Sequence, residues 1–133
     1  MKGHKTMEIF GHEYGMLYTV GAQQELAALC PDGDLSRLKE VMSGKTSEMT
    51  PEAAKIPMIL SDWHERAKSL EAAAEGGSYT PAPLSWDVIQ MLTVQQFGEL
   101  IGEAFTCMAR DMGRTVEADG EGTQKKTEAA AGS

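Results

Sequence analysis

The three histidines are the side chains of this 133-residue sequence best suited to metal or acid–base chemistry. His12 is followed by Glu13, but the zinc-protease motif would place its second histidine where Met16 stands. His4, His12 and His64 share no spacing that would bring them to one metal ion. We therefore predict that the histidines are surface or turn residues, and that no metal or other cofactor is bound.

Nucleophilic catalysis needs a serine or cysteine beside a base and an orienting group. Cys30 and Cys107 lie far apart, outside any CxxC pair, and we predict buried, reduced thiols at the ends of two apolar stripes. Asp62 and Glu65 flank His64, but such close neighbours on a helix do not share a face. The sequence does not exclude general acid–base catalysis by a pair of carboxylates, but no residue indicates it. We predict a protein that is not an enzyme.

The charge balance narrows the class of partner. The chain has 12 Lys and Arg against 20 Asp and Glu, a net charge of −8, whereas a nucleic-acid surface needs clustered basic residues. No apolar run is long enough for a transmembrane helix. The basic residues 1–5 lead into Glu8 rather than into an apolar signal core. We therefore predict a cytoplasmic protein that contacts neither nucleic acid nor membrane.

The clearest structural element is a helix over residues 93–112. Thr93 and Gln96 form a capping box at its start, and Gly113 ends it. Its predicted apolar stripe consists of Val94, Phe97, Ile101, Ala104, Phe105, Met108 and Met112. Such a stripe must be covered, and the candidates are a helix carrying residues 56–70 and the inner face of a hairpin.

The hairpin is predicted near the N-terminus, with strands over residues 7–10 and 14–19 around a turn at 11–13. Gly11 then takes the first turn position, and Tyr14, Met16 and Tyr18 share one face. Its free edge could accept strands from a second chain.

Helices are also predicted over residues 23–30, opened by 20–22, and over 35–42, 50–74 and 86–92. Residues 43–49 and 75–83 read as connections. Thr50 and Pro51 are a strong start signal for the long helix, whereas Pro57 predicts either a kink or a short first turn followed by a new helix. The fold class is α+β and mostly helical, with an N-terminal β-hairpin followed by four or five helices. We expect a flexible N-terminus over 1–6, a single domain over 7–113 and a disordered polar tail over 114–133.

Two features of the last helices suggest a partner surface. Gly98 and Gly102, four positions apart, indicate either a smooth strip for a close helix crossing, including one between chains, or tolerated surface glycines. The chain has nine methionines, and Met91, Met108 and Met112 read either as core filling or as part of a partner-binding groove.

The segment over residues 7–22, MEIFGHEYGMLYTVGA, resembles the opening of the tail assembly chaperones of long-tailed phages and prophages. Members of that family begin with a strand, a Gly-basic-Glu-Tyr turn, a second strand and a glycine-containing helix start, and His12 stands where lysine is commoner. The similarity extends more loosely to about residue 113.

The resemblance implies a non-enzymatic role. Such chaperones bind the long, helical tape measure protein, keep it soluble and help to recruit tail tube protein around it. We expect a homo-oligomer in which hairpins or long helices pair. Many members also have a frameshifted longer form, for which Lys125-Lys126 would be compatible with a slippery run of codons. The alternative is another small acidic adaptor or virion assembly protein.

Overall fold

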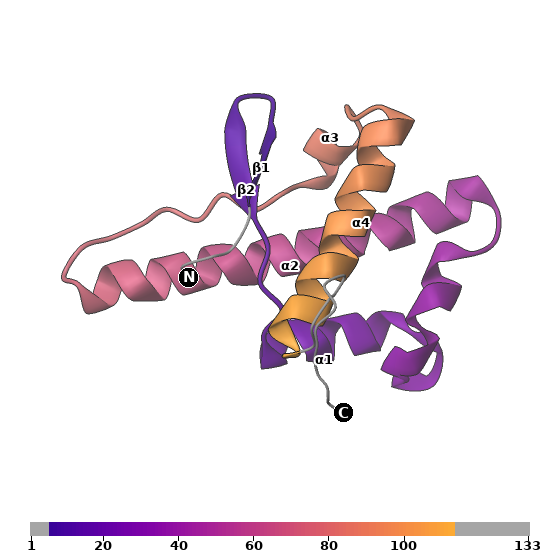
Figure 1. The fold of residues 1–133 in the computed structure, drawn as a ribbon, viewed down its shortest axis with the longest axis horizontal. Helices are drawn as coiled ribbons and strands as arrows, with labels where there is room; N and C mark the ends of the chain where they lie inside the picture. Colours follow the sequence, from indigo (N-terminus) through magenta and orange to yellow (C-terminus); the bar gives the residue numbers. More distant parts are fainter. Residues whose placement is uncertain (1–5, 114–133) are drawn as a thin grey trace, which may run out of the picture.

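One long helix, α2 (Thr46–Ala74), runs the length of the molecule, and the other elements pack along it (Figure 1). The computed structural model describes residues 6–113. The hairpin, α3 and the start of α4 lie on one side of α2 in this view, and α1 with the short 3-10 helices lies on the other. The predicted fold class is confirmed: α+β, mostly helical, with an N-terminal hairpin. The remaining elements are β1 (Thr6–Ile9), β2 (His12–Gly15), α1 (Val20–Leu29), η1 (Pro31–Gly33), η2 (Leu35–Met42), α3 (Trp86–Ile89) and α4 (Val94–Asp111).

The hairpin turn lies at Phe10 and Gly11, so the predicted turn at residues 11–13 is wrong. Both residues have positive φ, 50° and 80°, which is the backbone of a two-residue type I′ turn, with Gly11 in the second position. β1 begins at Thr6, inside the predicted flexible segment, and β2 ends at Gly15 instead of continuing to residue 19. Beyond Gly15 the chain turns onto α2, where the Leu17 N–H donates to the Leu60 carbonyl at 3.0 Å.

α2 begins earlier than the predicted start at residue 50. The helix begins at Thr46, after Lys45, which provides no side-chain cap, and Pro51 falls in the second turn. The alternative of a new helix near Pro57 is also wrong, because one helix continues through this residue. Pro57 is buried between other core residues of α2, and that packing outweighs the loss of one backbone hydrogen bond. Predicted stripe residue Leu70 is 73% exposed, since the last turns of α2 extend past the other helices (Figure 1).

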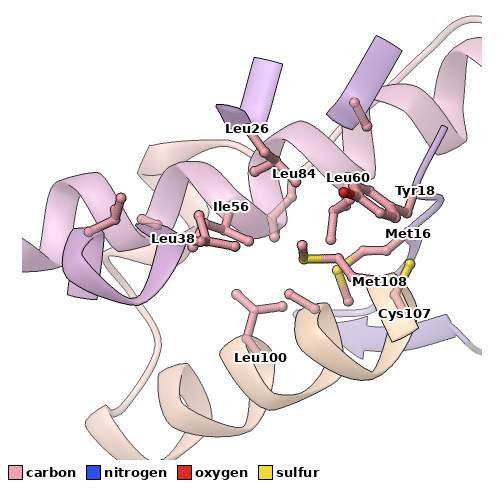
Figure 2. Close-up of a cluster of buried hydrophobic side chains, with 14 of the residues drawn as sticks. Met16, Tyr18, Leu26, Leu38, Ile56, Leu60, Leu84, Leu100, Cys107 and Met108 are labelled. Atoms are coloured by element: carbon pink, nitrogen blue, oxygen red, sulfur yellow. The ribbon is translucent and has the colours of Figure 1, made fainter. Parts of the chain in front are cut away.

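The capping box of α4 is confirmed, with the Gln96 N–H donating to Thr93 Oγ1 and the Thr93 N–H to Gln96 Oε1. Gly113 follows the helix with φ 80°, as predicted for a C-terminal glycine. The buried face, however, is turned from the predicted stripe. Figure 2 shows Leu100, Cys107 and Met108 directed from α4 toward the core that α2 supplies with Ile56 and Leu60.

The predicted cover for α4 is confirmed, because one cluster of buried side chains joins all the main elements. Alongside the α2 and α4 residues it contains Ile9 from the hairpin, Met16 and Tyr18 from the following segment, and Leu26, Leu38 and Leu84 (Figure 2). Val94, by contrast, is 90% exposed, so the first residue of the predicted stripe lies outside this core.

Candidate partner-binding surfaces

His64 and Glu65 are buried in α2, so the prediction of a surface histidine is wrong. Their exposed fractions are 5% and 1%, and His64 Nδ1 lies 3.5 Å from Glu65 Oε2. The imidazole packs on the backbone of Gly15, where a Cβ atom would overlap the ring. His64 and Glu65 therefore reach the same buried region. This was not expected, because adjacent positions on a helix do not share a face.

Glu65 secures the connection between α2 and α3. Its Oε1 accepts hydrogen bonds from the Tyr79 hydroxyl and from the Ala82 N–H, the latter at 2.9 Å. One turn earlier, Ser61 Oγ accepts the Leu84 N–H at 2.8 Å. Burial acts to raise the pKa of Glu65, but these hydrogen bonds outweigh it and hold the pKa below its ordinary value. The carboxylate is thus engaged in holding residues 79–84 against α2, as the path of the chain in Figure 1 shows.

A second tertiary contact lies at the end of α4, around Cys107. Asp111 Oδ2 accepts the Tyr18 N–H at 3.0 Å, and Arg110 binds Asp111 and reaches the Met16 carbonyl. Burial, followed by the charge of Asp111, raises the pKa of Cys107 to about 12. Its thiol is therefore protonated at neutral pH and is a poor nucleophile.

Both cysteines are buried and free, as predicted for reduced thiols. Within residues 6–113, no group of three His, Cys, Asp or Glu side chains could hold a metal ion. The same range contains no helix with the length and apolar character needed to cross a membrane.

The predicted glycine strip faces open space. A Cβ atom at Gly98 or Gly102 would meet no atom within 4 Å, so neither residue serves a close crossing within residues 6–113. The close approaches occur instead at Gly15, against His64, and at Gly21, where a Cβ would overlap the Trp63 ring. Gly21 thereby lets α1 cross α2 closely, a role that the glycine's position at a helix start gave no reason to expect.

The exposed apolar side of α4 forms the first candidate surface. We call it the α4 outer strip, and it consists of Val94, Gly98, Ile101, Gly102, Phe105 and Met112. Val94 is 90% and Met112 45% exposed, while Ile101 and Phe105 are half-buried. Helical periodicity places these residues on one side of α4, turned away from the buried Leu100.

The predicted methionine sites divide between core and surface. Met108 is 7% exposed and belongs to the core, so its predicted role in partner binding is not supported by its position. Met91 is 69% exposed in the turn between α3 and α4, and Met112 lies in the α4 outer strip. The structure therefore brings Gly98, Gly102 and Met112 to one surface and separates Met108 from them.

A groove between the hairpin and the start of α4 forms the second candidate surface, which the sequence did not indicate. We call it the hairpin groove, and it encloses about 160 Å³. Its lining combines apolar and acidic side chains: Met7, Glu8, Ile9, Phe10, Leu92, Gln96 and Glu99. Phe10, at the hairpin tip, is 69% exposed.

Comparisons with protein-family models, with curated proteins and with solved structures found no match to this chain.

Proposed function

We propose that this protein is a non-enzymatic tail assembly chaperone of a long-tailed phage or prophage, and that it binds the helical tape measure protein. The observation that carries the proposal is the α4 outer strip, an apolar helix side on which Val94 is 90% exposed and Cβ atoms at Gly98 and Gly102 would meet no atom of residues 6–113 within 4 Å. The resemblance of residues 7–22 to the opening of such chaperones supports the same role.

The strip has the features of a helix-packing surface. Val94, Ile101, Phe105 and Met112 follow one another at steps of seven, four and seven residues, which keep them on the same side of the helix. Gly98 and Gly102 lie between them, and the absence of side chains there lets a second helix approach closely. An amphipathic helix laid on this side of α4 would remove the exposed Val94 from water, a favourable change.

The rest of the proposed role follows from the same family. The chaperone would keep its apolar client soluble in the bacterial cytoplasm, help to recruit tail tube protein, and form homo-oligomers. Its net charge of −8 suits a carrier that must itself resist precipitation.

Val94→Asp tests the proposal by co-purification with the tape measure protein. The substitution keeps α4 intact, because an acid is favoured in the first turn, but it removes the apolar contact. We expect the variant to weaken binding at least about tenfold, or about 1.4 kcal/mol. Val20→Asp is the matched control, since Val20 is 76% exposed and also begins a helix.

Gly98→Ala/Gly102→Ala separates binding from stability. Each alanine enters open space within an α-helix and should raise the free energy of unfolding by about 0.5–1 kcal/mol. The added methyl groups should nevertheless weaken client binding, because they hold a facing helix away. A wild-type protein that captures no segment of the tape measure protein would refute the function. Full binding by both variants would refute the α4 outer strip as its site.

A further inference from the structure

The basic residues of this chain are segregated along its sequence. No Lys or Arg occurs from residue 6 to 36 or from residue 69 to 109. These ranges include the hairpin, α3 and all but the end of α4. Lys2 and Lys5 lie outside the described residues. Among the residues that the structure describes, the lining of the hairpin groove consequently includes Glu8 and Glu99 and no basic residue.

The hairpin itself carries an unfavourable charge pair. Glu8 and Glu13 are directly opposite each other in the register of β1 and β2, an arrangement in which like charges repel. Glu13 also interacts electrostatically with Lys68 of α2, whereas Glu8 lines the groove. A cation bound in the groove would reduce the repulsion around Glu8.

The floor of the groove is apolar. Ile9 is 6% exposed, and Met7 and Leu92 are partly buried against the same core. Phe10 adds an exposed aromatic face at one end. A volume of about 160 Å³ can receive an apolar side chain but not a complete helix.

We propose that the hairpin groove is a second binding site, distinct from the α4 outer strip, for a Lys- or Arg-bearing segment of a protein partner. One apolar side chain of that segment enters between Met7, Ile9 and Leu92. Flanking basic residues pair with Glu8 and Glu99. Charge complementarity selects this occupant, because a second copy of the same groove would bring like charges together.

A peptide titration followed by NMR of the ¹⁵N-labelled full chain tests this site. The probe is a short peptide with one Leu between Lys residues in a Gly and Ser background. We expect amide shifts at residues 7–10 and 92–99. Raising the NaCl concentration from about 0.05 M to about 0.5 M should weaken binding about tenfold. A peptide with Glu in place of Lys should cause no shifts.

Two comparisons decide the outcome. Glu8→Gln/Glu99→Gln should weaken binding about fivefold, whereas Glu48→Gln/Glu75→Gln, which changes the net charge equally at exposed positions outside the groove, should not. Replacing the Leu of the probe by Ser should abolish the shifts. Equal shifts with the Ser peptide, or equal loss in both double variants, would overturn the proposal. Because the probe does not include the tape measure protein, these results are independent of the proposed function.

Discussion

Glu65 is the residue whose ionisation bears most directly on the fold. It is 1% exposed, and the hydrogen bonds from Tyr79 and Ala82 favour its charged form despite the cost of burial. Its pKa therefore lies below the ordinary value of 4.5. The unfolded chain binds a proton more readily than the folded chain, so this contribution to stability is present above pH 4.5. It is lost as the pH falls through the lower folded pKa.

Glu65→Gln should lower the free energy of unfolding at pH 7 by about 1–3 kcal/mol, because a neutral amide binds the Tyr79 and Ala82 donors less strongly. Urea unfolding at several pH values measures the effect. The difference from wild type should shrink as the pH falls below 4.5 and through the lowered pKa of the folded carboxylate, because the wild-type side chain then becomes neutral as well. Glu75→Gln, at an exposed position, is the control. A difference independent of pH would contradict the role given to the charge.

At the scale of single residues, the sequence predicted the burial of the two thiols but not the burial of the ionisable pair His64 and Glu65. Cysteines with apolar neighbours are usually buried, so Cys30 and Cys107 followed a general tendency. The burial of His64 depends on Gly15, distant in sequence, and that of Glu65 on a connection with no regular structure. Local spacing carries no information about such non-local contacts.

The two prolines of α2 show how packing decides the course of an element. Pro51 is exposed in the second turn and removes a backbone donor there without burying its ring. Pro57 also lacks that donor, but its ring is fully buried in the core. Core packing therefore offsets the loss of the backbone donor at Pro57, but nothing comparable offsets it at Pro51.

Pro51→Ala should raise the free energy of unfolding by about 1–2 kcal/mol, since it restores a helical hydrogen bond and introduces a good helix former. Thermal and urea unfolding measure the change. Pro57→Ala is the comparison: it restores the same kind of bond but opens a small cavity, so its gain should be smaller or absent. A larger gain at Pro57 would show that its ring does not contribute to the core.

In α4 the two helix ends were predicted better than the buried face, and the reason is physical. The capping box at Thr93 and the stop at Gly113 depend on neighbouring residues alone. The buried face of α4 depends on where α2 lies, and the apolar pattern extended beyond the part that α2 covers. The α4 outer strip is the uncovered remainder: Val94 fitted the predicted stripe yet is 90% exposed.

At the scale of the whole molecule, charge opposes self-association while the α4 outer strip favours it. Each copy carries a net charge of −8, and Glu99 and Glu103 lie on α4 itself. Two copies that pair through this helix must overcome that repulsion, which salt screens. The proposed homo-oligomer should therefore be more stable at high ionic strength, whereas binding of a basic segment in the hairpin groove should be weaker there.

Light scattering after size-exclusion chromatography tests this expectation. The wild-type mass should increase between about 0.05 M and about 0.5 M NaCl, because screening reduces the repulsion between acidic copies. Val94→Asp should shift the protein toward the monomer at both salt concentrations, since it places one charge at the N-terminal end of each paired strip. Val20→Asp adds the same charge at an exposed position on α1 and should leave the mass unchanged. A strict monomer at high protein and salt concentration would contradict self-association, and equal dissociation by both variants would assign it to overall charge rather than to the α4 outer strip.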